Sequence, residues 1–192
     1  MFSKTISTLF IGVGVALASP AALAADGCAP GAPAEGITEN MGAWDFLIGH
    51  HDVDVRLWQD DAWTDPVATA EWNGWWGLEG YAIVDEWFGP ANAEGLRNRG
   101  VNVRVWDEDA GRWRMTWQAT RGAEAAIYES EVRDDGFMHM WQVSPPEEAE
   151  TDAWFEITGD DTWIRVQKTR DETGAWINQF RLDAVRVPCD PE

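Results

Sequence analysis

Residues 101–119 read VNVRVWDEDAGRWRMTWQA, two alternating runs on either side of an Asp- and Gly-rich segment. In the second run Trp113, Met115 and Trp117 occupy every other position. A period of two places alternate side chains on one face of a β-strand, and aromatic and β-branched residues suit such half-buried surfaces. Residues 107–111 have the composition of a hairpin turn. The stretch therefore predicts two antiparallel strands joined by a tight connection.

The same arrangement recurs along most of the chain, with turn signals at residues 134–136, 159–161 and 171–174. The predicted strands cover residues 51–58, 67–76, 81–88, 101–106, 113–119, 125–133, 137–143, 154–158, 163–169 and 176–187. A short helical turn is expected within residues 37–47. Sequential antiparallel strands of this number close into a barrel or fold over as a sandwich. We predict an all-β fold, an antiparallel up-and-down barrel of about nine to ten strands.

The first 24 residues have the composition of a secretory signal peptide. Lys4 precedes an apolar run at residues 9–18, Pro20 ends that run, and the small residues at 22–24 form a cleavage signature. We therefore expect export to the bacterial periplasm or outside the cell. Residues 25–40 are predicted to be an extended lead-in, and residues 41–192 a single barrel domain.

The two cysteines lie near opposite ends of the exported part, Cys28 after the cleavage signature and Cys189 close to the C-terminus. In an oxidising compartment two such cysteines usually pair, so we predict a disulfide between them. Two unpaired thiols are the alternative. Neither cysteine lies in a His- or Cys-rich cluster, which argues against a zinc site.

The chain is strongly acidic, with a formal net charge of −20. Nucleic acids and anionic membranes both require a basic surface, so neither is an expected partner. The sequence has no Asp-x-Asp-x-Asp-Gly calcium loop, and we expect the acidic residues to be solvated surface. After the signal peptide no apolar run is long enough to span a bilayer, so membrane insertion is not expected.

Residues 44–53, WDFLIGHHDV, resemble the opening of a large group of mostly uncharacterised secreted bacterial proteins with lipocalin-like, calycin-type β-barrels. The usual opening of that group is Phe-Asp-Phe-Trp-Leu-Gly-Glu-Trp-Asp-Val. The resemblance continues at residues 78–87, 100–107 and 111–117, and ends in a strand like 176–186. It implies a barrel with an internal cavity, and it implies no settled activity.

His51 stands where the group has a tryptophan. By alternation it shares a face with Val53, Val55 and Leu57, so it is expected to be buried, whereas His50 points to the opposite face. The two histidines therefore cannot chelate one metal together. His51 is either a packed histidine bonded to a carbonyl or acid, or a proton-transfer group or metal or haem ligand inside the barrel.

Two further residues are candidates for acid/base chemistry with His51. His139 shares a face with Trp141 and would be a second interior histidine if that face points inward. Asp85 and Glu86 are adjacent, so one carboxylate points inward. A carboxylate in an apolar barrel has a raised pKa, which suits proton transfer.

Candidate ligand-binding residues combine aromatic rings with a few polar groups. An arginine inside an aromatic barrel could hold a ligand carboxylate, whereas an outward arginine would form surface ion pairs. Several strands carry both polar and apolar residues on each face, so the sequence does not show which face points into the barrel. The candidates are Trp113, Trp117, Trp141, Asn102, Arg104 and Arg165.

The standard enzyme motifs are absent, including the Gly-x-Ser-x-Gly elbow, phosphate and dinucleotide loops, His-Glu-x-x-His and Cys-x-x-Cys. We favour a barrel that binds a small apolar or aromatic molecule without a cofactor. One alternative is an enzyme that uses His51 with His139 or Asp85 as an isomerase, lyase or hydrolase. Another is a structural or partner-binding module with a filled core and an exposed patch at Trp58, Trp63 or Trp76.

Overall fold

The computed structural model describes residues 29–36, 39–120, 122, 124–145 and 152–188. The predicted signal peptide lies outside these residues, and so do Cys28 and Cys189 of the predicted disulfide. Of the predicted lead-in, residues 29–36 run beside the barrel. The Trp76 amide donates to the Pro30 carbonyl at 2.7 Å, and the Ala34 amide donates to that of Gly80 at 3.2 Å.

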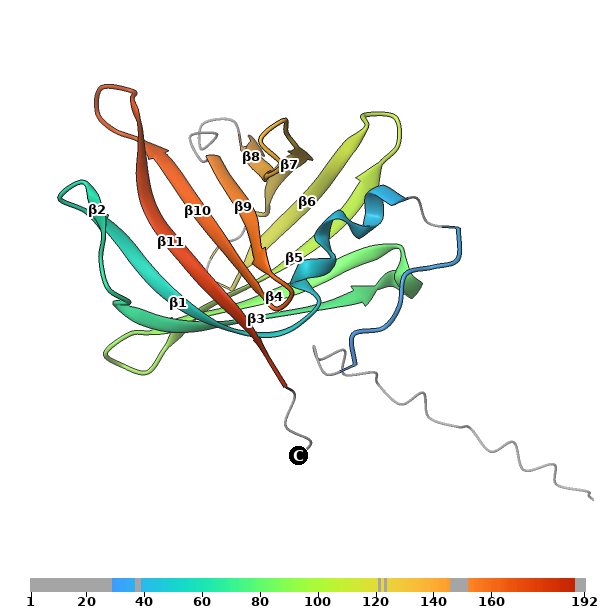
Figure 1. Ribbon diagram of the computed structural model, residues 1–192, viewed down its shortest axis with the longest axis horizontal. Helices are drawn as coiled ribbons and strands as arrows, with labels where there is room; N and C mark the ends of the chain where they lie inside the picture. The colour runs from blue at the N-terminus through green and yellow to red at the C-terminus, as the bar shows by residue number, and fades with distance from the viewer. Residues whose placement is uncertain (1–28, 37–38, 121, 123, 146–151, 189–192) are drawn as a thin grey trace, which may run out of the picture.

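Ten antiparallel strands form a closed barrel. The course of the chain around the barrel can be followed in Figure 1. Each strand pairs with its neighbours in the chain, apart from the short β2 (Ala62–Trp63), which pairs only with the end of β1. The barrel closes where β11 pairs with β1, from His50 opposite Val187 to Leu57 opposite Phe180. The barrel strands are β1 (Gly49–Gln59), β3 (Ala68–Gly77), β4 (Ala82–Ala91), β5 (Arg97–Asp107), β6 (Arg112–Ala119), β7 (Ala126–Val132), β8 (Met138–Ser144), β9 (Asp152–Gly159), β10 (Thr162–Arg170) and β11 (Trp176–Val187).

The predicted all-β barrel of nine to ten strands is therefore confirmed, and each predicted strand overlaps one observed strand. The Asp/Gly segments form the expected tight turns. Between β5 and β6 the Gly111 amide donates to the Asp107 carbonyl at 2.8 Å. Between β7 and β8 the Gly136 amide donates to the Arg133 carbonyl at 2.8 Å. Both glycines have positive φ, 63° and 81°, a backbone conformation that glycine adopts without steric penalty.

A 3₁₀ helix, η1 (Glu39–Leu47), fills one end of the barrel. Its Met41, Trp44 and Leu47 side chains are buried. The Trp44 ring packs edge-to-face on Phe155 at 5.0 Å. We call this end, filled by η1, the closed end. A second short 3₁₀ helix, η2 (Leu78–Gly80), links β3 to β4. No described helix is both long enough and apolar enough to span a membrane.

Tryptophans supply much of the core at the closed end. Trp72 packs edge-to-face on Trp163 with ring centroids 5.4 Å apart, and on Trp87 at the same distance. Trp113 is buried beside Trp106, with centroids 6.0 Å apart. Such pairs stabilise a fold by about 0.5–1.5 kcal/mol each beyond the burial of their area. The closed end is thus a rigid aromatic base below the rest of the barrel.

Candidate functional site

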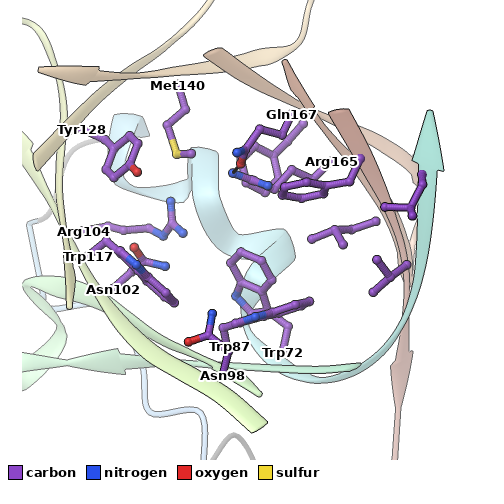
Figure 2. A pocket seen from close by; sticks show the side chains of 15 residues that line it. Trp72, Trp87, Asn98, Asn102, Arg104, Trp117, Tyr128, Met140, Arg165 and Gln167 are labelled. Atoms are coloured by element: carbon purple, nitrogen blue, oxygen red, sulfur yellow. Dashed lines mark hydrogen bonds between the residues drawn. The ribbon is translucent and has the colours of Figure 1, made fainter. Parts of the chain in front are cut away.

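A cavity of about 430 Å³ lies inside the barrel above η1 (Figure 2). It reaches solvent beside Asn98, which is exposed. Most of its lining is apolar or aromatic: Val55, Leu57, Trp72, Trp87, Trp117, Met140, Phe155, Phe180 and Leu182. The remaining lining residues are polar: Asn98, Asn102, Arg104, Tyr128, Arg165 and Gln167. This composition suits a ligand with an apolar body and a small number of polar groups.

Strand β5 turns its polar face inward. Asn102 and Arg104 are 6% and 1% exposed and line the cavity, whereas Val105 is 37% exposed on the outer face. The sequence did not show which face of β5 points into the barrel, and the contacts with the neighbouring strand β4 determine it. Asp85 on β4 lies opposite Asn102, so this inward carboxylate offers a partner to both polar side chains of β5.

Asp85 and Arg104 form a buried ion pair next to the cavity. The Arg104 Nε donates to Asp85 Oδ2 at 2.5 Å and Nη2 donates to Oδ1 at 3.2 Å. The Asn102 Nδ2 also donates to Oδ1, at 2.8 Å. On its other side the Arg104 guanidinium lies 4.2 Å from the Trp44 ring centroid. Of the adjacent carboxylates Asp85 and Glu86, Asp85 is thus the one that points inward. It is the hydrogen-bonded partner of Arg104 and does not itself line the cavity.

Arg165 is a second buried cation, and its contacts differ from those of Arg104. It is 8% exposed, and its Nη2 donates to Gln167 Oε1 at 2.7 Å. Its Nε has no hydrogen-bond partner, and none of the ion pairs among the described residues includes it. The guanidinium lies 5.6 Å from the Phe155 ring centroid and 5.2 Å from that of Phe180. Burial lowers the pKa of Arg165 to about 10, which still leaves it charged near neutral pH.

His51 is buried, as predicted, but at the closed end and outside the lining of the cavity. Its Nδ1 donates to the Trp72 carbonyl at 3.2 Å, and its ring lies edge-to-face on Trp163 at 5.6 Å. The Nε2 has no hydrogen-bond partner in the part of the chain that the structure describes. Burial lowers the pKa of His51 to about 4, so the imidazole is neutral near pH 7. Of the alternatives raised by the sequence, this geometry matches the packed histidine bonded to a carbonyl.

His139 is not an interior histidine, which corrects the placement considered for it. On β8 the side chains of Met138 and Met140 point into the core, so the alternate residues His139 and Trp141 lie on the outer wall. There the His139 Nε2 lies 2.8 Å from Asp135 Oδ2. The strand wall separates His139 from His51, and the structure does not assemble the acid/base pair suggested by the sequence.

Trp141 is likewise not a cavity residue. The guanidiniums of Arg133 and Arg112 lie 5.4 and 6.0 Å from its ring centroid on the outside of the barrel. Aromatic side chains on this outer face are covered by such cations and by each other, as in the stack of Phe137 on Trp154 at 5.0 Å. The flexible methionines instead fill the irregular space inside.

Trp117 and Trp113, the other two tryptophans predicted to bind a ligand, lie in different parts of the barrel. Trp117 lines the cavity and packs closely over Gly100, where a Cβ would approach the ring to 2.1 Å. Trp113 is buried at the closed end and does not reach the cavity. The structure therefore brings Trp117, Asn102, Arg104 and Arg165 together around one cavity.

Several lining residues were not singled out from the sequence. Gln167 follows Arg165 by two positions, so alternation alone places it on the same face. Phe180 lies opposite Gln167 across β10 and β11, and Trp87 lies opposite Trp72 across β3 and β4. Their role depends on these cross-strand pairings, which the sequence does not specify.

The tryptophans considered for an exposed patch are not prominent on the surface. Trp58 and Trp63 pack edge-to-face at 4.9 Å and are half-buried, and Trp76 packs against the core. The cavity also shows that the core is not completely filled. No group of three or more His, Cys, Asp or Glu side chains is arranged to hold a metal ion in the part of the chain that the structure describes.

Comparison with protein-family models and with curated proteins finds no match for this chain. Inferences about its chemistry therefore depend on the cavity itself: an aromatic wall, a neutralised Asp85–Arg104 pair and a second arginine that forms no ion pair among the described residues.

Proposed function

We propose that this protein is an exported β-barrel that binds a small, largely apolar or aromatic molecule in its interior. The observation that carries the proposal is the cavity of about 430 Å³ with its aromatic lining. Small-molecule sites are typically apolar cavities of roughly 300–1,000 Å³ with a few well-placed polar groups. The N-terminal sequence, with its signal-peptide pattern, supports a location in the periplasm or outside the cell. The resemblance to secreted lipocalin-like barrels agrees with both parts of the proposal.

The wall of the cavity is rigid, which favours binding over collapse. Protein interiors are packed at a density of about 0.74, and voids that can hold more than a water molecule are few. Here Trp87 is held by Trp72, and Trp117 lies against the backbone at Gly100. A preformed site needs little ordering when its ligand enters, so less binding energy is lost.

A neutral aromatic probe tests this proposal. N-phenyl-1-naphthylamine fluoresces strongly in apolar surroundings, and we expect a saturable rise in its emission with the purified exported chain. Val55→Trp would fill part of the cavity and should abolish the signal. The matched control is Val105→Trp, because Val105 lies on the outer face and its replacement leaves the cavity unchanged.

Both variants should keep the far-ultraviolet circular dichroism of the parent. A folded parent that gives no saturable signal, or a Val55→Trp variant that binds as the parent does, would contradict the proposal. Mass-spectrometric analysis of protein purified from the periplasm would then identify a retained natural ligand.

A further inference from the structure

We infer that the ligand carries a single carboxylate and that Arg165 binds it. This inference depends on the proposed function and narrows it to a class of molecule: a small apolar or aromatic monocarboxylate. Its starting point is that Arg165 is more than nine-tenths buried, lines the cavity and has an Nε without a hydrogen-bond partner among the described residues. Figure 2 shows Arg165 and Gln167 together on one side of the cavity, across from Arg104 and Tyr128.

The charges around the cavity do not cancel. Arg104 and Arg165 are the charged residues of its lining, and Asp85 bonds only to the first of them among the described side chains. The Asp85–Arg104 pair is neutral, so Arg165 leaves one positive charge inside a chain whose net charge is −20. An isolated buried charge is strongly unfavourable unless it is paired. A bound anion would supply the missing partner.

The guanidinium is also held in one orientation. Phe155 and Phe180 lie at 5.6 and 5.2 Å from it, and Gln167 accepts its Nη2 hydrogen. Gln167 is itself fixed, because its Nε2 donates to Gln179 Oε1 at 2.9 Å. Arginine has five N–H donors in a planar fork that matches the two oxygens of a carboxylate. Since only one of these donors is used by Gln167, the fork can still receive a ligand.

The count of charges favours a monoanion over a dianion. A carboxylate would neutralise Arg165, whereas a phosphate monoester with two negative charges would leave one of them buried without a partner. The rest of the lining is mainly aromatic and aliphatic, so the remainder of the molecule must be apolar. Because the chain as a whole is acidic, selectivity for an anion has to arise from Arg165 inside the cavity.

Competition between decanoate and decanol tests this inference, since the two share an alkyl chain and differ in charge. Each is titrated against bound N-phenyl-1-naphthylamine near neutral pH. We expect the parent to bind decanoate at least about tenfold more tightly than decanol, the size of a charge-assisted hydrogen bond. Arg165→Met should remove this preference and leave decanol binding within about twofold of the parent. Arg170→Met is the matched control, because Arg170 lies on the same strand, is exposed and does not line the cavity; it should retain the preference.

Equal displacement by decanoate and decanol in the parent would overturn the inference, and so would a preference that survives in Arg165→Met. Where Arg165→Met does not fold, Arg165→Gln takes its place, with the same expected loss. If the neutral probe does not bind the parent at all, the proposed function fails as stated. Direct calorimetric titration of decanoate then decides the present inference separately, because an absence of saturable heat would overturn it.

Discussion

The Asp85 carboxylate accepts two hydrogen bonds from the Arg104 guanidinium, and both side chains are at most 1% exposed. The pair bridges β4 and β5, with Arg104 in the cavity lining and Asp85 behind it. Arg104 already has a counter-ion, so its charge is not available to a ligand. Arg165 has no such counter-ion among the described residues, so its charge is available. This difference between two arginines in one cavity underlies most of the predictions below.

Removing one partner of the buried pair should be strongly destabilising. Asp85→Asn leaves the Arg104 charge without compensation, and we expect the free energy of unfolding in urea to fall by about 3–5 kcal/mol. Asp183→Asn is the control, because Asp183 pairs with Arg56 and Arg181 where all three side chains are partly exposed. Its loss should lower stability by about 1 kcal/mol or less. The double variant Asp85→Leu with Arg104→Met should be more stable than Asp85→Asn; equal instability would show that packing, not charge, explains the loss.

The strands could be predicted from the sequence, but their inward faces could not. Local alternation gives the period of a strand, whereas the choice of inward face depends on the strands beside it. On β5 the valines at 101, 103 and 105 would be the natural core residues. Asn102 and Arg104 point inward instead, where both bond to Asp85, which lies opposite Asn102 on β4. On β8 the more aromatic face is the outer one, so the condition for an interior His139, an inward-facing Trp141, is not met.

Only part of the candidate site was predictable, because its contacts also depend on neighbouring strands. Trp117, Asn102, Arg104 and Arg165 were identified as residue types suited to a ligand, and the structure places all four at the cavity. The difference between the two arginines could not be predicted, because the partner of Arg104 lies 19 residues away on another strand. Whether a buried charge is paired is a property of the tertiary structure.

Arg165→Met should stabilise the ligand-free protein. The substitution removes a buried donor that has no partner, and such groups reduce stability by about 1–3 kcal/mol. We expect a rise of this order in the free energy of unfolding in urea. Decanoate should raise the thermal midpoint of the parent more than that of the variant, whereas decanol should raise both midpoints equally. Higher stability with weaker ligand binding is the common trade between stability and function. A variant less stable than its parent would indicate that Arg165 is a structural residue.

His51 should make the stability of the fold depend on pH in mildly acidic solution. Burial lowers its pKa in the folded state to about 4, below the 6.5 of an unperturbed histidine. Between these values the unfolded state binds more protons, so stability increases with pH across this window and is complete above about 6.5. As pH falls from about 6.5 to 4, the contribution of His51, on the order of 3 kcal/mol, is lost.

The comparison variant is His51→Phe, which keeps a ring against Trp163 and cannot titrate. Urea unfolding of both proteins at several pH values isolates the contribution of His51, because the carboxylates are common to the two. We expect the parent to lose stability more steeply than His51→Phe between pH 6.5 and 4. Parallel curves would mean that His51 is protonated in the folded protein or is not buried.

Gly100→Ala should disturb the aromatic wall of the cavity. A Cβ at this position would lie 2.1 Å from the Trp117 ring, so the ring has to move. Overpacking of this kind destabilises a fold by about 1–3 kcal/mol, and the displaced ring should weaken binding of N-phenyl-1-naphthylamine. Gly122→Ala is the control, since no atom of the described residues lies within 4 Å of its added Cβ. Unchanged probe binding in a destabilised Gly100→Ala variant would argue against Trp117 as part of the binding wall.

Gln167→Glu gives the most direct test of how Arg165 is used. The side chain hardly changes in size, and Gln167 Oε1 already lies 2.7 Å from Arg165 Nη2, so the variant should supply an internal carboxylate. Pairing the buried Arg165 charge with a carboxylate stabilises the fold, whereas the loss of the exposed Gln167 Nε2 bond to Gln179 costs little, so we expect higher stability in urea. The affinity for decanoate should fall by about tenfold or more while that for decanol is kept. Gln118→Glu adds the same charge outside the cavity lining, on the outer face of β6, and should leave both affinities unchanged. If Gln167→Glu binds decanoate as tightly as the parent does, the carboxylate of the ligand does not contact Arg165.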